Sequence, residues 1–407
     1  PPTAFFAGAT SDDDDDEDEI SESILDLAAQ VYPAVLLEWH YRSRSEALIA
    51  FSNRAFYGGR LIAAPNPRAL TAGGAIGFMQ VTDAYFTAKD GNPVEASRVI
   101  DYLIARILEN PMRSYGVIAM GVSQANALQE ALDTRMMSDP KIASLIEAAR
   151  NFKDGDSDAG LFIKSLENVQ GDERDVIILS VGYAPAGPGK KLRLGFGPLS
   201  TKGGSRRLNV AITRAKHEMQ VFCSFNPSEV PTDEETFARN PDLCVFGRYL
   251  KYAEAVSCGN QLSAAGVLDS FPVSGFISHR KPSRFSLDVK RRLEEQGYKV
   301  SLEIGTSGFY IDMAIHHPVV ESSFLLGIEC DGAIFHSTPY ARDRDKIRQD
   351  LLESRGWKII RVWSQDWSKD WRREVQRIKS RVDEILEKSN SGIRPTDERE
   401  TIKQATK

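Results

Sequence analysis

The sequence predicts two successive α/β domains, a larger one over residues 26–228 and a smaller one over residues 283–388. The chain has 407 residues, which is enough for two or three separate cores. Strand-like and helix-like segments alternate through the first domain, and a new series of elements begins after a connector at 229–282. The polar flanking segments, 1–25 and 389–407, are predicted to be disordered.

Composition excludes several classes of protein. Hydrophobic residues make up 42% of the chain and charged residues 27%, as in globular proteins. No run of about 18 uncharged apolar residues and no signal peptide is present, so we expect no membrane span and a cytoplasmic protein. Four scattered cysteines without a CxxC pair argue against a disulfide framework and against a structural zinc site.

The net charge of −6 comes from one segment. Eight consecutive acids, Asp12 to Glu19, account for it, and without them 51 basic residues face 49 acidic ones. We interpret this run as a solvated, disordered loop. The chain starts at Pro1-Pro2-Thr3 rather than at Met, which suggests a cut within a larger protein.

In the larger domain, periodicity predicts strands that alternate with helices. A parallel sheet covered on both faces is expected from this order. The predicted strands are 74–81, 115–120, 175–181 and 219–225; the predicted helices are 45–57, 94–109, 124–134 and one that opens over 208–215.

The smaller domain is predicted to have the order αβββαβα. Its first helix is amphipathic and its second is basic. The predicted helices are 283–296, 343–354 and 371–387, and the predicted strands are 300–304, 309–315, 324–330 and 358–363.

Three separated segments of the larger domain carry residues suited to a polyanion. Arg42 follows Tyr41 before a helix, a polar segment with Gly171 precedes the strand at 175–181, and Arg214 lies in the basic segment 206–216. Arginines on separate loops can converge on one phosphate, and a glycine lets backbone approach a ligand. Taken singly, each arginine is more often a surface ion pair.

Together these segments resemble the second RecA-like motor domain of superfamily 1B helicases. Residues 39–43 and 51–57 are similar to helicase motif IV, residues 165–175 to motif V, and residues 207–216 to motif VI. The likeness covers about residues 1–226, and it implies a RecA-like fold for the larger domain.

The resemblance also implies roles for single residues. Two would be arginine fingers at the γ-phosphate of ATP, two would couple ATP to nucleic acid, one would bind the nucleotide sugar, and two would contact the bound strand. In that order they are Arg42 and Arg214; Gln170 and Gly171; Glu173; Ser165 and Gln124.

The sequence lacks a Walker A loop. The nearest imitation, Gly187 to Lys191, has Lys191 in place of the Ser or Thr that binds Mg²⁺. We therefore expect ATP hydrolysis only together with a missing N-terminal RecA-like motor domain in cis.

Acidic residues and one histidine lie near the ends of two predicted strands in the smaller domain. Asp312 is on one strand, Glu329 and Asp331 are on the next, and His336 follows. Residues two apart on a strand share a face, and such oxygen ligands suit Mg²⁺ or Mn²⁺. The alternative is an acidic strand edge that only makes ion pairs.

This pattern resembles the PD-(D/E)XK nuclease superfamily, in the branch of the very short patch repair (Vsr) endonuclease. The resemblance implies a restriction-endonuclease-like fold, with Asp312, Glu329 and Asp331 as metal ligands and His336 as a ligand or general acid/base. The sequence departs from the superfamily at Asp331, where relatives carry Lys.

A basic stretch follows the acidic residues. Twelve Arg or Lys face seven Asp or Glu between Tyr340 and Lys379, and four tryptophans lie among them. Such a mixture suits contact with a phosphate backbone, for which Arg344 and Arg348 are candidates. The alternative is that the tryptophans are core and the charges pair internally.

The sequence thus predicts the C-terminal part of a bacterial ATP-dependent helicase-nuclease acting on single-stranded or branched DNA. Two alternatives stay open. In one, the smaller domain binds DNA without cutting it, because Asp331 replaces the catalytic Lys. In the other, the motor remodels RNA.

Overall fold

The computed structural model describes residues 37–67, 74–272, 281–305, 308–320, 323–331 and 341–390, and a few positions between 24 and 35. The chain divides into two compact units. The first contains Phe78–Ala215 and Met219–Lys251, together with the residues through Trp39; the second contains His40–Gly77, Lys216–Glu218 and Tyr252–Lys407. Within the described ranges, no helix has the length and apolar character needed to cross a bilayer.

A five-stranded sheet forms the centre of the first unit. Its strand order is β1-β7-β6-β2-β5, and β2 pairs in parallel with both β5 and β6. The order is non-sequential, as expected when helices connect parallel strands. The strands are β1 (Ile76–Gln80), β2 (Tyr115–Ala119), β5 (Phe162–Ser165), β6 (Arg174–Ser180) and β7 (Ala215–Cys223).

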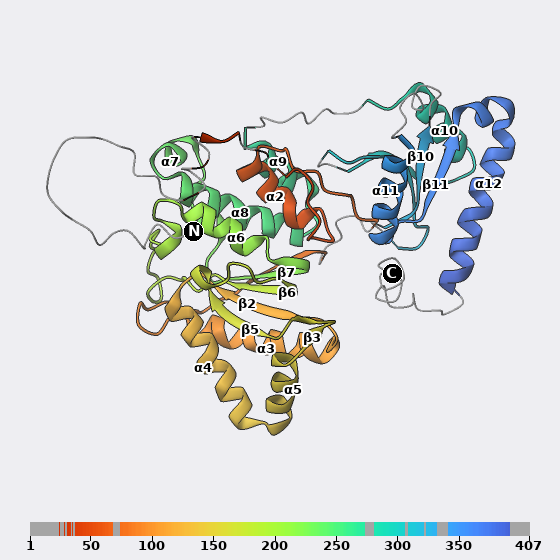
Figure 1. Cartoon of the computed structure of the whole chain (residues 1–407). Helices are drawn as coiled ribbons and strands as arrows, with labels where there is room; N and C mark the ends of the chain where they lie inside the picture. The colour runs from red at the N-terminus through yellow and green to blue at the C-terminus, as the bar shows by residue number, and fades with distance from the viewer. Residues whose placement is uncertain are drawn as a thin grey trace. The chain divides into compact units, whose positions relative to one another are not determined.

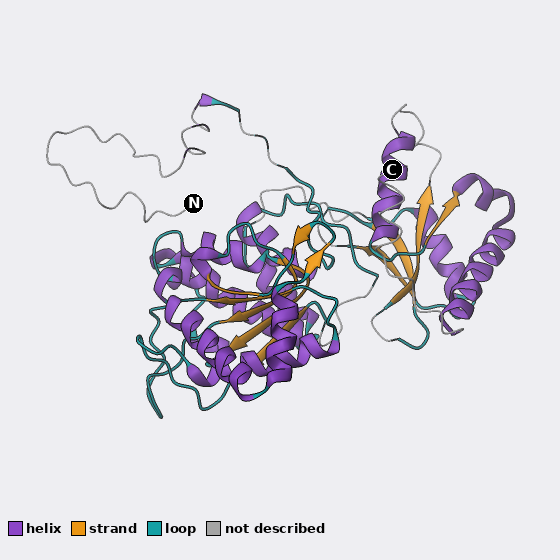
Figure 2. Ribbon diagram, turned by 60° about the horizontal axis from the view of Figure 1, so that its bottom comes forward, coloured by secondary structure: helices purple, strands orange, loops and turns teal. Residues whose placement is uncertain are grey.

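Helices cover both sides of this sheet (Figures 1 and 2). On one side lie α3 (Pro93–Glu109), α4 (Val122–Ser138) and α5 (Pro140–Arg150), and on the other lie α6 (Gly204–Ile212) and α8 (Pro241–Ser257). Val117 and Val176 belong to the apolar core with α3 and α4. The next residues along the two strands, Ile118 and Ile177, are fully buried as well. Burial of both faces explains the apolar runs within β2 and β6, and it confirms the predicted covered parallel sheet.

Between Phe78 and Lys251, the remaining elements of the first unit are short. They are the hairpin of β3 (Lys153–Asp154) and β4 (Ser157–Asp158), the helix α7 (Glu234–Arg239), and three 3-10 turns.

One predicted helix is shifted. The sequence was expected to open a helix over 208–215, but α6 ends at Ile212 and β7 begins at Ala215. The helix stops because side chains bond its last carbonyls: Thr213 Oγ1 donates to Asn209 O at 2.8 Å, and Arg214 Nε donates to Val210 O at 2.6 Å. Arg214 therefore lies at a helix-to-strand junction.

In the second unit, α2 (Ala47–Tyr57) packs against α9 (Gln261–Asp269) and the end of α8. Phe51 of α2 lies 5.7 Å from the Tyr252 ring and 5.4 Å from the Phe271 ring. The helix ends at Gly58, whose φ of 59° is in the left-handed region that favours glycine. The predicted helix at 45–57 is confirmed.

A four-stranded sheet forms the rest of the second unit, in the order β11-β10-β9-β8. The β8–β9 and β9–β10 pairs are antiparallel and the β10–β11 pair is parallel. The predicted order αβββαβα is confirmed. The elements are α10 (Arg284–Glu294), β8 (Val300–Ile304), β9 (Ile311–His316), β10 (Phe324–Asp331), α11 (Ala341–Ser354), β11 (Ile359–Trp363) and α12 (Ser364–Asn390).

The two faces of this smaller sheet are covered differently. Val289 of α10 and Ile378 of α12 pack on one face. The opposite face is covered by α11 and by the early segment that follows α2: Ile62 and Ala64 belong to one apolar cluster with Trp357. Trp357 is 1% exposed, so it is a core residue, as the alternative interpretation of the tryptophans holds. The predicted boundaries did not anticipate that residues near 62 pack with residues near 357.

We expect Gly116→Ala to destabilise the chain by about 1–3 kcal/mol, because a Cβ on this β2 residue would lie 2.4 Å from the Phe162 ring. Urea denaturation measures the effect. A matched control is Gly195→Ala, where a Cβ would meet nothing within 4 Å. Equal stabilities of the two variants would contradict the close packing of β2 against β5.

Candidate functional site

The loop that contains Gly171 meets Arg214 in the first unit. Arg214 Nη1 donates to Asp172 O at 3.4 Å, and the backbone N–H of Arg174 donates to Arg214 O at 3.2 Å. Gly171 has a φ of 93°, and a Cβ there would meet nothing within 4 Å, so the backbone faces open space. The structure thus brings together the predicted residues Gln170, Gly171, Glu173 and Arg214, with Gln170 and Gly171 exposed.

Two neighbouring side chains stabilise this loop. Arg174 is buried, donates to Gly160 O at 2.8 Å and lies over the Phe162 ring. Lys164 pairs with Asp172 at 2.7 Å. The loop is therefore tied to β5 as well as to Arg214.

Arg42 lies in the second unit, in the turn that precedes α2. Its side chain is partly buried. The turn is closed by His40, whose Nε2 accepts the Ser43 N–H at 3.0 Å. Because burial and the nearby Arg42 and Arg355 lower the pKa of His40 to about 4, this nitrogen is unprotonated and can accept the bond at neutral pH.

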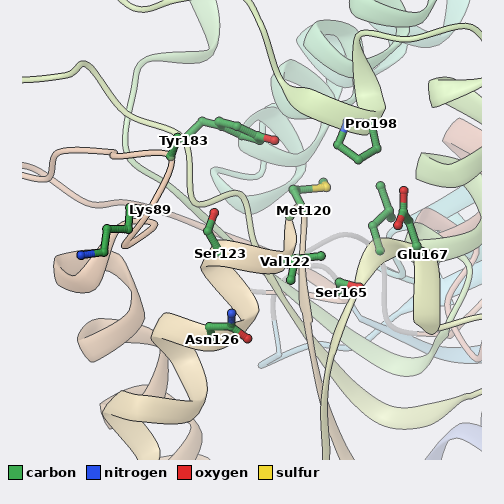
Figure 3. Close-up of a pocket in the computed structure, with 12 residues that line it drawn as sticks. Lys89, Met120, Val122, Ser123, Asn126, Ser165, Glu167, Tyr183 and Pro198 are labelled. Atoms are coloured by element: carbon green, nitrogen blue, oxygen red, sulfur yellow. The ribbon is translucent and has the colours of Figure 1, made fainter.

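A cavity of about 550 Å³ opens at the carboxyl ends of the parallel strands. Met120 follows β2 and Ser165 ends β5, and ligands of α/β sheets commonly bind at this edge. Figure 3 shows Ser123 and Asn126 on the α4 side, Ser165 and Glu167 across from them, and Tyr183 and Pro198 toward the top. The predicted residue Ser165 therefore lines a cavity.

Gln124, the second predicted strand contact, is turned away from solvent. It is 2% exposed, its Nε2 donates to Ser180 Oγ at 3.0 Å, and its Oε1 accepts the Asn92 N–H at 2.8 Å. A Cβ on Gly182 would lie 2.6 Å from the Gln124 side chain, so this residue is closely enclosed. The polar residues of α4 that do reach the cavity are Ser123 and Asn126, which sequence reasoning missed.

Gln124 belongs to a buried polar network centred on Glu95. The Glu95 carboxylate accepts hydrogen bonds from Ser224 Oγ at 2.6 Å, Ser180 Oγ at 2.7 Å and Gly182 N at 2.8 Å. Burial raises the pKa of Glu95 to about 7, and the three hydrogen bonds oppose that rise. The network fixes the backbone that leads to Tyr183, on the cavity wall. The sequence signal was Asn92-Pro93, which predicts a helix start but not an inward-facing Glu95.

The acidic residues of the second unit lie on the face of the smaller sheet that α11 covers. The β9–β10 register pairs Met313 with Ile328 and so places Asp312 beside Glu329. Both are buried, at 4% and 8% exposure, and Asp312 Oδ2 accepts the Cys330 N–H at 2.7 Å. Burial raises the pKa of Glu329, Arg348 opposes the rise, and Asp312 adds to it. The structure brings the two predicted carboxylates together.

Two arginines also reach this face. Arg348 of α11 donates to Glu329 at 3.3 Å and lies over the Phe309 ring. Arg361 of β11 pairs in register with Glu329, and its Nε lies 3.6 Å from Asp331 Oδ2. Arg361 was missed because its cross-strand partner is set by the register. His336 lies outside the described residues, as does the side chain of Arg344.

The donor set suits a hard divalent cation in part. Asp312 and Glu329 offer two adjacent carboxylates. Burial raises the pKa of Glu329, with a smaller contribution from Asp312, so a nearby cation would stabilise its charged form. However, no group of three or more His, Cys, Asp or Glu side chains able to hold a metal occurs in the described part of the chain. The expected third ligand, Asp331, lies against Arg361 instead.

Comparison with known families assigns both parts of the chain. A family profile described as an AAA domain, AAA_12, matches residues 20–226, just over half of the 407 residues. The chain belongs to this AAA-domain family. A second profile, REase_MTES_1575, matches residues 285–382. This AAA-domain protein therefore combines a helicase-like domain with a restriction-endonuclease-like domain.

Two curated relatives are similar over most of the chain. They are named as uncharacterised ATP-dependent helicases: MG140 of Mycoplasma genitalium, 28% identical over 85% of this chain, and its homologue in Mycoplasma pneumoniae, 28% identical over 81%. The AAA-domain chain covers 29% and 28% of their lengths, less than a third.

Solved structures also match this chain. One of them is the C-terminal domain of a possible DNA helicase from Lactobacillus plantarum, with a TM-score of 0.27 and 14% identity over 48% of this chain and 95% of that chain. At this score the likeness bears on neither fold nor function.

We expect the stability of this AAA-domain protein to fall between pH 5 and pH 8 because of Glu95. Its folded pKa of about 7 lies above the ordinary value of 4.5, so its contribution is complete below pH 4.5 and is lost as pH rises through 7. Relative to Glu95→Gln, the wild-type free energy of unfolding should drop by up to roughly 3 kcal/mol over this range. Urea titrations at several pH values measure it, and parallel curves for the two proteins would contradict a buried, titrating Glu95.

Proposed function

We propose that this chain combines two activities in one polypeptide. One is the half of an ATP-dependent DNA motor that closes on the bound nucleotide, and the other is a metal-dependent DNA endonuclease. The observation that carries the motor half is the contact of Arg214 with the Gly171 loop, because it holds a guanidinium beside an exposed, glycine-opened backbone. Membership of the AAA-domain family supports the same assignment.

In this proposal Arg42 and Arg214 stabilise the charge that develops on the γ-phosphate, and Glu173 binds the nucleotide sugar. Gln170 and Gly171 transmit the nucleotide state to the strand-binding cavity. The phosphate-binding loop and the Mg²⁺ that neutralises the phosphates would come from an N-terminal motor domain in cis.

The strand-binding cavity at the carboxyl ends of β2 and β5 is proposed to hold single-stranded DNA. Its hydroxyl and amide groups, on Ser123, Asn126 and Ser165, can bond phosphate oxygens, and Tyr183 offers an aromatic surface for a base. The loop that runs from Tyr183 to Pro198 adds three exposed cations, Lys190, Lys191 and Arg193. These would neutralise phosphates beside the cavity.

Replacing the three loop cations by Gln is expected to weaken binding of single-stranded DNA and to lower its salt dependence. Three lost phosphate contacts reduce the slope of log K against log salt by about 2. Fluorescence anisotropy over a salt series measures the slope. The control removes three equally exposed cations from α5 and β3, Lys141, Arg150 and Lys153; an equal effect in both variants would contradict a local strand path.

The restriction-endonuclease-like domain is proposed to cut DNA with Mg²⁺ or Mn²⁺. Asp312 and Glu329 would hold the ion, and Asp331 or His336 would complete its ligands. A bound ion would supply an activated water and charge stabilisation at the phosphodiester. Arg348 and Arg361 would then face the phosphate once the ion neutralises the carboxylates.

Nicking of supercoiled plasmid by the 407-residue chain tests this activity. We expect nicking with Mg²⁺ or Mn²⁺, none with EDTA, and a fall to background in Asp312→Asn, which keeps an acceptor for the Cys330 N–H but loses the charge. Asp366→Asn, an exposed residue of α12, is the control. Nicking that persists in Asp312→Asn would contradict the assigned ligand.

One alternative is favoured by a specific observation. The pairing of Arg348 with Glu329 and of Arg361 with Asp331 already offsets the acidic charge, as in a domain that binds DNA without cutting it. Binding without nicking under any metal would favour this alternative. The other alternative is a motor that remodels RNA, and competition between DNA and RNA strands of equal length tests it. An RNA preference above about tenfold, roughly 1.4 kcal/mol, would contradict the DNA assignment.

A further inference from the structure

We propose that the nuclease-like domain is a working part of the motor: Arg355, which follows α11, is a positioning residue for Arg42. This inference rests on the proposed role of Arg42 as an arginine finger. It adds to that role a requirement that lies about 310 residues further along the chain.

The first observation is a pair of hydrogen bonds that bracket Arg42. The Arg355 guanidinium donates to Tyr41 O at 3.1 Å and also to Ser43 O, so it holds the carbonyl groups on both sides of Arg42. Its fork of donors suits two carbonyls at once. The backbone of Arg42 is thereby held from the nuclease-like domain.

The second observation is that Arg355 is buried for this contact. It is only 9% exposed, and burial, with a smaller contribution from Arg44, lowers its pKa to about 10. Its guanidinium donates to two carbonyls, and both belong to the Arg42 turn. A buried cation needs such partners, so the contact is a built part of the second unit and not an incidental surface pairing.

The third observation is that residues 44–67 are hydrogen-bonded to the smaller domain at several further points. Trp357 Nε1 donates to Pro65 O at 2.8 Å, Phe324 N donates to Pro67 O at 2.7 Å, and Arg44 Nη1 donates to Ser354 O at 3.3 Å. Ile62 and Ala64 pack in the apolar cluster around Trp357.

The segment 60–67 and the turn that carries Arg42 are also hydrogen-bonded to each other. His40 N donates to Ile62 O at 2.9 Å, and Asn66 Nδ2 donates to Arg44 O at 3.0 Å. The segment 60–67 and the Arg42 turn therefore form one piece, and that piece lies on the smaller sheet. Figure 1 shows the segment after α2 running alongside α11.

A loss of Arg42 positioning and a loss of stability alone should have different effects on ATP hydrolysis. An arginine finger contributes in the transition state, so a backbone that no longer holds Arg42 lowers kcat and leaves KM for ATP nearly unchanged. A domain that merely contributes stability would lower the melting temperature without this separation of kcat and KM.

The test compares Arg355→Gln with Arg373→Gln, which removes an exposed arginine from α12 of the same domain. In the 407-residue chain, hydrogen exchange of backbone amides at 40–46 should become at least tenfold faster in Arg355→Gln, with no change in α12. In the full-length protein, kcat for ATP hydrolysis should fall at least fivefold, with KM within twofold. Arg373→Gln should change neither quantity.

Trp357→Phe keeps the aromatic packing and removes only the donor to Pro65 O, so it provides a milder variant if Arg355→Gln fails to fold. It should show the same pattern with smaller size. Suppose that Arg42→Ala loses much of its kcat but folded Arg355→Gln keeps wild-type kcat and wild-type hydrogen exchange. This result would overturn the positioning role of Arg355 and leave the motor role of Arg42. Unchanged kcat in Arg42→Ala would overturn the proposed motor role and this inference with it.

Discussion

The second unit depends on one constraint: the apolar face of the smaller sheet that includes Trp357 must be covered. Ile62 and Ala64 belong to that cover, and Trp357 Nε1 finds its acceptor at Pro65 O. An indole N–H buried without a partner costs about 1–3 kcal/mol, so removal of the early segment would expose apolar surface and leave a donor unsatisfied as well. This constraint joins two stretches of chain that the sequence separates by nearly 300 residues.

The same constraint sets the surroundings of the acidic residues. Asp312 and Glu329 lie on the face covered by α11, and that helix brings Arg348 to Glu329 before the chain reaches Arg355. Glu329 is buried enough that its carboxylate requires a cation, and the structure meets this with a guanidinium. One helix thus connects the face that carries Asp312 and Glu329 with the turn that carries Arg42, so these residues belong to one folded unit.

Much of the fold could be predicted from the sequence, because β-branched runs and helical periodicity are local signals. The strand Arg174–Ser180 and the order αβββαβα are examples. The end of α6 could not be read in this way, since Thr213 and Arg214 stop it by bonding carbonyls within a basic, helix-compatible segment. Of the candidate residues, Glu329 lies on a strand as expected, Arg214 lies between α6 and β7 rather than within a helix, and Gln124 is enclosed by Gly182. Glu95, which was not a candidate, is turned inward. The direction in which these side chains point depends on neighbours in three dimensions, which the spacing of residues in the sequence does not specify. The same holds for the pairing of Arg361 with Asp331.

The central claim is that the acid-bearing sheet and the Arg42 segment form one folded unit. The most direct measurement is solvent exchange of the five tryptophan indole protons by NMR on the 407-residue chain, with Trp357 assigned through its loss in Trp357→Phe. We predict that the Trp357 indole proton exchanges at least 100-fold more slowly than the indole proton of Trp39, a residue that is 55% exposed. Equal exchange of the two protons would mean that the segment at Pro65 does not lie on the sheet, and would contradict the account.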